Sequence, residues 1–217
     1  MKHILIYTLL LLMIAPFAKA QQDPEAKEIL DKLSAATKAH ETIVADFKVT
    51  YTSTKDNASN SSEGTIKIKG EKYQMDFMGT VTYFNGKTIW SYLKEANEVN
   101  ISDPMEDGTD LMGNPQSIFT IYEHDFKYKY LGTEIDRGET LWVVDLYPED
   151  LSQQYARIRL YINKDDLYLS GAQVYGKEGS NFTISISNFK TDMPLPEDTF
   201  VFDEEEHPKA EIIDLRW

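Results

Sequence analysis

Hydrophobic residues change their spacing once along this chain, and the change separates two kinds of predicted structure. Asp23, Pro24 and Glu25 place a capping residue, a proline and an acid in the order typical of a helix start. Apolar residues then recur at helical spacing up to about His40. They are Ala26, Ile29, Leu30, Leu33 and Ala36. The pattern predicts one amphipathic helix that buries a single face.

From Thr42 onward, apolar and polar residues alternate with a period of two, which is typical of β-strands with one buried face. The alternation begins with Ile43, Ala45, Phe47 and Val49 and returns in later segments that are separated by turn-forming residues. These segments are Ile66/Ile68, Tyr73/Met75/Phe77, Trp142/Val144/Leu146, Ile158/Leu160/Ile162, Leu167/Leu169 and Phe182/Ile184/Ile186. The pattern predicts an antiparallel meander of about ten strands.

One helix of about 17 residues cannot cover a sheet of this size, so we expect the sheet to curl around its own apolar face. A second short helix beginning at Pro115, with Ile118 and Phe119 on one face, is expected to lie across the opening as a lid. The predicted fold class is mainly β (α+β): a curled antiparallel sheet forms an incomplete β-barrel with an N-terminal amphipathic helix and a short helical lid. Such a sheet either packs solid or holds a hydrophobic ligand.

The first twenty residues have the pattern of a secretory signal peptide. Lys2 precedes an apolar run at residues 4–14, and Ala18, Lys19 and Ala20 form an A-x-A cleavage site. We therefore predict a signal peptide at residues 1–20 and one exported domain at residues 21–217, which is long enough to bury its own core. The chain contains no cysteine, so neither a disulfide nor a cysteine-linked lipid anchor is expected.

The formal net charge of −14 at pH 7 narrows the choice of partners. An acidic surface repels phosphate backbones and anionic headgroups, so nucleic-acid binding and stable membrane insertion or adsorption are not expected. The charge is sufficiently explained as a means of keeping the protein soluble. Docking on a basic partner remains the alternative.

The segment Asn85-Gly86-Lys87-Thr88 resembles part of a phosphate-binding loop, but its context is wrong. A P-loop requires glycine five positions before its Gly-Lys pair, where Val81 stands, and strand patterns flank both sides. Asn85 and Gly86 instead give a strong type I′ hairpin signal. We predict a hairpin turn here.

No metal, cofactor or catalytic site is predicted. The sequence beginning at Asp103 has an EF-hand-like start but carries Asn114 at the twelfth position, where a calcium loop needs glutamate. His40, His124 and His207 lie far apart in the sequence, and no nucleophile motif is present. The sequence therefore favours a binding protein over an enzyme.

An ordered series of segments resembles the LolA-type outer-membrane lipoprotein carriers of Gram-negative bacteria. NGKTIWSY at residues 85–92 is similar to that family's D/N-G-x-x-L-W-x-Y segment, and NPQSIF at 114–119 to its P-x-x-L-L helix. The series also contains ADF at 45–47, GTIKI at 64–68, KYQM at 72–75, LWVVDLYP at 141–148, FTISISNF at 182–189 and FVF at 200–202. The resemblance extends over about residues 23–214.

The resemblance implies a monomeric periplasmic carrier that holds the acyl chains of lipoproteins in a hydrophobic cavity. Such a carrier would take acylated lipoproteins from an inner-membrane ABC transporter and pass them to an outer-membrane acceptor. The acceptor role itself is not expected, because acceptors of that kind are anchored through a lipidated cysteine. A sensor of misplaced lipoproteins and a carrier of another lipid are the alternatives, and an enzyme that uses the cavity is a weaker third.

Period-2 alternation and the resemblance together select candidate residues for this cavity. The expected lining is Phe47, Val49, Tyr73, Met75, Trp90, Tyr92, Trp142 and Val144, and the expected lid residues are Ile29, Leu33, Ile118 and Phe119. Members of the family typically carry an arginine-proline pair between the second and third strands, where the arginine tethers the lid. Here Lys69-Gly70-Glu71 stands in that place, so Lys69 is the candidate tether. If ligand binds near Trp90, its fluorescence should shift.

Overall fold

The structure, a computed structural model, describes residues 22–55, 57–104 and 126–216. This part of the chain contains one α-helix, α2 (Pro24–Ala39), and one short 3₁₀ helix, η4 (Glu197–Phe200). The strands are β1 (Thr42–Ser53), β2 (Ala58–Lys69), β3 (Lys72–Phe77), β4 (Thr80–Phe84), β5 (Ile89–Leu93), β6 (Glu98–Ser102), β7 (Phe126–Asp136), β8 (Glu139–Pro148), β9 (Tyr155–Asn163), β10 (Leu169–Gly176), β11 (Ser180–Thr191) and β12 (Glu211–Asp214). The predicted signal peptide and the predicted lid helix from Pro115 lie outside the described residues.

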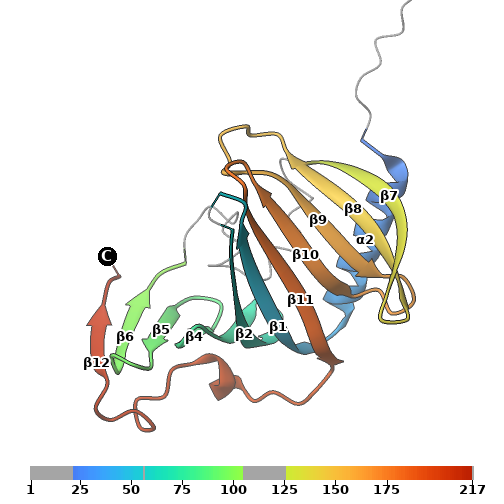
Figure 1. Cartoon of the computed structure of the whole chain (residues 1–217). Helices are drawn as coiled ribbons and strands as arrows, with labels where there is room; N and C mark the ends of the chain where they lie inside the picture. Colours follow the sequence, from blue (N-terminus) through green and yellow to red (C-terminus); the bar gives the residue numbers. More distant parts are fainter. Residues whose placement is uncertain (1–21, 56, 105–125, 217) are drawn as a thin grey trace, which may run out of the picture.

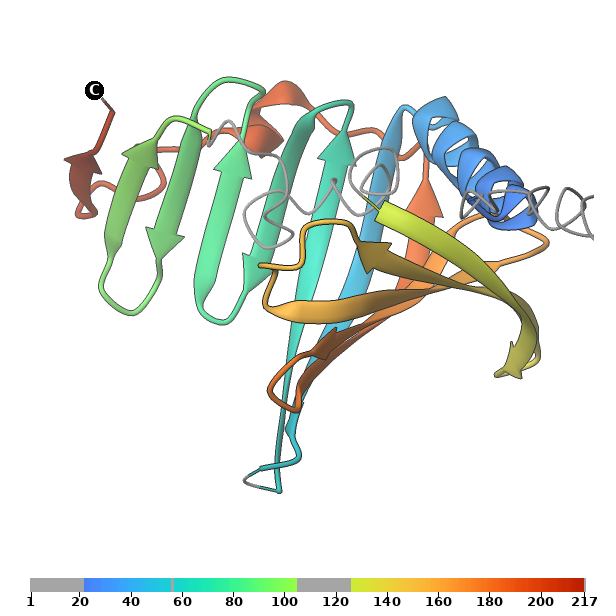
Figure 2. The same ribbon diagram turned by 90° about the horizontal axis from the view of Figure 1, so that it is seen from above.

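All twelve strands belong to one sheet, in the order β12-β6-β5-β4-β3-β2-β1-β11-β10-β9-β8-β7. Neighbouring strands pair antiparallel, except that β12 lies parallel to β6. The sheet curls strongly from one end to the other, as Figure 2 shows. The predicted incomplete β-barrel with an N-terminal helix is therefore confirmed. The strand count exceeds the predicted ten in part because β12 has only four residues and no alternation of its own.

Helix α2 is fastened to the sheet through Asp23, the residue that caps its N-terminus. One carboxylate oxygen of Asp23 accepts hydrogen bonds from the backbone N–H groups of Glu25 and Ala26, at 3.0 and 3.3 Å. The other accepts the backbone N–H of Tyr130 in the edge strand β7, at 3.0 Å. Partial burial alone would raise the pKa of Asp23, but the hydrogen bonds from Tyr130, Ala26 and Glu25 hold that pKa below its usual value.

The apolar stripe of α2 covers the concave side of the sheet at β7–β10 (Figure 1). Ala26 and Leu30 are fully buried there, and Ile29 and Leu33 nearly so. They pack on a cluster of inward-facing strand residues. The strand residues of this helix-covered core are Phe126, Tyr128, Val144, Leu146, Ile158, Leu160, Ile162, Leu169 and Ala172. The main core thus lies at the β7–β10 end of the sheet.

A C-terminal segment, residues 192–214, crosses the opposite face of β3–β6. Its Phe202 ring lies 5.3 Å from the Tyr92 ring and 6.1 Å from the Tyr83 ring, measured between centroids. His207 lies 4.4 Å from Tyr92. The segment ends as β12, which extends the sheet beyond β6. It therefore buries aromatic side chains on the outer face.

The segment Asn85-Gly86-Lys87-Thr88, which resembles part of a phosphate-binding loop, joins β4 to β5. The predicted hairpin is therefore confirmed. Its turn differs from the prediction. The N–H of Asn85 donates to the carbonyl of Thr88 at 3.4 Å, so the two central residues are Gly86 and Lys87. Only Gly86 has a positive φ, of 92°, whereas a type I′ turn needs positive φ at both central residues. The Asn85 side chain instead accepts the backbone N–H groups of Lys87 and Thr88, which shifts the turn by one residue.

Candidate apolar binding face

The inward positions of the curled sheet are free of charge over most of its width. No Asp, Glu, Lys or Arg occupies an inward position in β1, β2, β3, β8, β9, β10 or β11. Charged residues of these strands, such as Asp46, Lys48 and Arg159, lie at outward positions. An uncharged concave surface is suited to apolar ligands because it requires no ion to be desolvated.

This concave surface has two parts that differ in how well they are covered. Under α2, Val144, Leu160 and Ala172 have no exposed surface, so this part packs solid. At the other part, on β1, β2, β3 and β11, eight inward apolar side chains remain half-buried or exposed, although neighbours such as Phe77 are buried. We call this second part the apolar face, and it consists of Phe47, Val49, Tyr51, Ile66, Met75, Phe182, Ile184 and Ile186.

Aromatic pairs connect neighbouring strands of the apolar face. The Phe47 and Phe77 rings lie 5.2 Å apart across β2, and the Tyr51 and Phe182 rings lie 5.2 Å apart between β1 and β11. Phe182 keeps 42% of its surface exposed. Large apolar side chains that are incompletely covered on one face are typical of a binding surface.

Gly64 lets the Phe47 ring lie across β2. A Cβ added at Gly64 would stand 2.6 Å from the Phe47 Cζ and 2.6 Å from the backbone oxygen of Asp76. Because a backbone atom cannot swing away, we expect Gly64→Ala to lower the free energy of unfolding by about 1–3 kcal/mol in urea titrations. Ser62→Ala, on the same face of β2, is the control and should be near neutral. Equal values for the two variants would contradict this packing.

The structure brings most of the predicted cavity residues to the concave side. Phe47, Val49 and Met75 lie on the apolar face, and Tyr73 lies in a small core beside it. Trp142 and Val144 belong to the region under α2. Ile29 and Leu33, expected in the lid, lie on the buried face of α2 and pack against the sheet. Ile118 and Phe119 lie outside the described residues.

Trp90 and Tyr92 lie on the opposite face from the other predicted lining residues. Phe84, on the same face as Tyr73, pairs with Ile89, so the even-numbered residues of β5 point outward. There the C-terminal segment covers Tyr92. A period of two relates residues within one strand, but the turn between strands decides which set shares the face of the neighbouring strand.

Lys69, the candidate lid tether, holds the C-terminal segment among the described residues. Its Nζ donates to the backbone oxygen of Leu195 at 3.1 Å and pairs with Glu197 at 3.0 Å. The lid segment that it was expected to hold lies outside the described residues. Residues of β11 on the apolar face were not among the predicted lining. Their alternation in FTISISNF was a signal that could have identified them.

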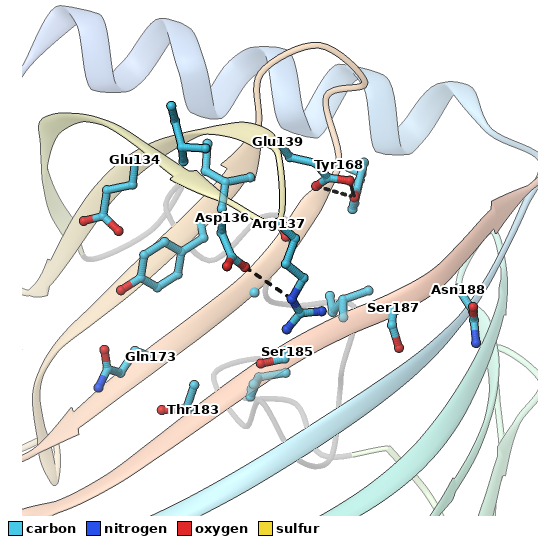
Figure 3. A pocket seen from close by; sticks show the side chains of 17 residues that line it. Glu134, Asp136, Arg137, Glu139, Tyr168, Gln173, Thr183, Ser185, Ser187 and Asn188 are labelled. Carbon is cyan, nitrogen blue, oxygen red and sulfur yellow. Dashed lines mark hydrogen bonds and ion pairs between the residues drawn. The ribbon is translucent and has the colours of Figure 1, made fainter.

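The outer face carries a hollow of different chemistry, shown in Figure 3. It has a volume of about 500 Å³ and lies between the β7–β8 hairpin and the outward residues of β9–β11. Carboxylates, hydroxyls and amides line it, and Glu139 accepts a hydrogen bond from the Tyr168 hydroxyl at 3.0 Å. Burial, followed by this bond, raises the pKa of Tyr168. A polar hollow of this kind offers an acyl chain little to bind.

Burial also raises the pKa of the tyrosines beside the helix-covered core, namely Tyr128, Tyr130 and Tyr155. These phenols stay protonated at neutral pH. Within residues 22–55, 57–104 and 126–216, no three His, Asp or Glu side chains gather closely enough to hold a metal ion. In the same ranges, no helix has the length and apolarity needed to cross a membrane.

Comparisons with known proteins agree with this geometry. A family model described as "Outer membrane lipoprotein carrier protein LolA" matches residues 16–139. Among curated proteins, no sequence match is found. An uncharacterised conserved protein from Thermus thermophilus is similar in structure, with 16% identity and a TM-score of 0.57, over 88% of this chain and 99% of that chain.

Two further solved structures are more distantly similar. A LolA superfamily protein from Nitrosomonas europaea has 15% identity and a TM-score of 0.45, over 82% of this chain and 98% of that chain. The lipoprotein LppX from Mycobacterium tuberculosis has 14% identity and a TM-score of 0.49, over 81% of this chain and 100% of that chain.

Proposed function

Because the chain belongs to the family of outer membrane lipoprotein carrier proteins, LolA, whose model matches residues 16–139, we propose that it is a periplasmic lipoprotein carrier. It binds the acyl chains of lipoproteins on its apolar face and shuttles them from the inner to the outer membrane. Residues 21–217 are the mature, monomeric domain that remains after removal of a signal peptide. Its partners are acylated lipoproteins, an inner-membrane ABC transporter and an outer-membrane acceptor.

The observation that carries the proposal is the contrast between the two parts of the concave surface. The part under α2 is closed, whereas the part on β1, β2, β3 and β11 leaves Val49, Met75 and Ile186 incompletely covered. The apolar face is uncharged and continues directly from the core. An acyl chain laid along it would bury apolar surface on both partners without desolvating an ion.

The free energy gained by burying acyl chains favours a carrier that buries its cargo only in part. Each buried methylene is worth about 0.8 kcal/mol, so 15 to 20 methylenes approach roughly 12–16 kcal/mol, which corresponds to nanomolar binding or tighter before costs. A carrier that buried every methylene would release its cargo too slowly. An open apolar face, which covers part of each chain, permits transfer to an acceptor that covers more.

Native mass spectrometry of the protein isolated gently from the periplasm of its host tests the proposal. We expect a population that carries an acylated protein. Free lipid alone would replace the lipoprotein cargo with another lipid. A stable complex with an unlipidated protein, and no acylated species, would favour a sensor of misplaced lipoproteins instead.

Tryptophan fluorescence distinguishes the two faces of the sheet. Trp142 points inward, with the Lys32 Nζ 5.7 Å from its ring centre, whereas Trp90 lies on the outer face. Because Trp142 belongs to the closed part under α2 and Trp90 lies on the outer face, a diacylated peptide should shift the emission of the wild type only slightly. The shift should be large in Phe182→Trp, which places an indole on the apolar face. A shift no larger in Phe182→Trp than in the wild type would contradict the proposed site.

A further inference from the structure

Outward positions of β7 and β9, on either side of β8, gather positive charge in this acidic protein. Lys127 and Lys129 lie opposite Tyr147 and Asp145 across the β7–β8 pairing, and Asp145 lies opposite Arg159. We call Lys127, Lys129, Arg157 and Arg159 the basic patch. Strands stand about 4.8 Å apart and same-face residues about 6.8 Å apart along a strand, so the four cations occupy one continuous area.

Asp145 organises the two arginines of this patch. It accepts the Nε and Nη2 of Arg159 at 2.7 and 3.0 Å, and its Oδ2 lies 3.5 Å from Nη1 of Arg157. The Arg157 guanidinium stacks over the Tyr175 ring at 3.9 Å. Asp145 is 1% exposed, so its negative charge is hidden while the cations reach the surface. Within the described residues, the buried Nε of Arg157 lacks a hydrogen-bond acceptor.

Exposed apolar groups adjoin the basic patch. Leu151, in the loop after β8, is 79% exposed, and Tyr147 is 36% exposed. The Nζ of Lys177 donates to the backbone oxygen of Leu151 and brings a fifth cation to the area. Glu149 and Asp150 stand in the same loop, but Asp150 is engaged with the Ser152 backbone and hydroxyl at 2.8 Å each. Asp23 also lies near Lys129. With Asp145 these acids make four against five cations, so the local charge stays positive.

We propose that the basic patch, with Tyr147 and Leu151, docks the protein weakly and reversibly on an anionic lipid surface. Lysine and arginine bind anionic headgroups electrostatically, and an adjacent tyrosine and leucine suit the apolar boundary beneath them. The chain as a whole carries a charge of −14, so an anionic surface repels the molecule on balance and attracts it where the cations gather. The patch therefore orients the molecule. The inference does not depend on the proposed cargo, because it concerns the outer face alone.

An acidic protein is the competing occupant, and the exposed leucine argues against it. An acidic peptide would pair with the cations but would gain little from a solvent-exposed Leu151 beside them. A lipid surface uses both kinds of group at once. The effect of Leu151 therefore separates the two occupants.

Co-sedimentation of residues 21–217 with vesicles tests the proposal directly. Vesicles of phosphatidylglycerol and phosphatidylethanolamine should retain the protein at low ionic strength, and pure phosphatidylcholine vesicles should not. Each basic residue near an anionic surface contributes about fivefold to partitioning, so Lys127→Glu with Lys129→Glu should weaken it about 30-fold or more. Leu151→Ser should weaken it several-fold.

The control is Lys87→Glu with Lys209→Glu, which makes the same change of charge at exposed lysines outside the patch. It should retain most of the binding. Equal losses in the two double variants, or no difference between the vesicle types for the wild type, would overturn the proposal. Binding of poly-glutamate with no vesicle binding, unchanged by Leu151→Ser, would assign the patch to an acidic protein instead.

Discussion

Replacing Asp145 with alanine is expected to lower the free energy of unfolding by about 3–5 kcal/mol, because it leaves two arginines without their shared buried carboxylate. The side chains of Arg157 and Arg159 are 32% and 20% exposed, so water replaces the lost partner incompletely. In the wild type, the hydrogen bond that Arg159 donates to Asp145, opposed by burial, raises the pKa of Arg159. Arginine keeps its proton in proteins even without such a partner, so Arg159 stays charged in the variant and cannot escape the cost by losing a proton. Urea unfolding followed by circular dichroism measures the loss.

Asp136→Ala is the matched control for this prediction. Asp136 pairs with Arg137 at 3.6 Å on the surface, where the two side chains are 60% and 70% exposed. Exposed pairs contribute about 0–1 kcal/mol, so this variant should unfold nearly as the wild type does. If Asp145→Ala cost no more than Asp136→Ala, the buried network would not hold β8 to β9 as described.

Val49→Asp is expected to weaken acyl-chain binding by about 100-fold or more, because it places a carboxylate on the apolar face where cargo would desolvate it. Val49 lies between Ser62 of β2 and Ile184 of β11, in the middle of that face. It is half-buried and outside the closed cores, so the fold should tolerate the change. Displacement of a fluorescent fatty acid by a diacylated peptide gives the affinity.

The neighbouring residue supplies the control with the same change of charge. Thr50 points to the outer face of β1, where its hydroxyl lies 2.9 Å from that of Ser61. Thr50→Asp should leave acyl binding within a few-fold of the wild type. A similar loss in both variants would mean that the added charge acts at long range, and the apolar face would no longer be the supported site.

Local patterns predicted the helix and the curled sheet well, because capping chemistry and alternation act over a few residues. Asp23 begins α2 as expected, and its bonds to Glu25 and Ala26 are local. Its third bond, to Tyr130, joins segments far apart in sequence and has no local signal. The same holds for β12, whose pairing with β6 depends on where residues 192–210 lead the chain.

The candidate site was predictable in part. Phe47, Val49 and Met75 share a face because β1, β2 and β3 are joined by regular antiparallel pairing. Trp90 and Tyr92 were grouped with them, although the turn between β4 and β5 leaves the even-numbered residues of β5 pointing outward. The basic patch was not predicted, because its four cations lie in two pairs, on β7 and β9, which meet only through their register with β8.

The pairing of β1 with β11 fixes the order in which this chain can fold. Ile43 near the start pairs with Thr191 near the end, in the middle of the sheet. The strands on either side can form hairpins early, but they cannot join until Ser180–Thr191 has been synthesised. Closing so long a loop is slow, so the nascent chain stays open until it is almost complete. If the chain is exported, as proposed, this delay would leave it unfolded and able to pass through a translocation pore.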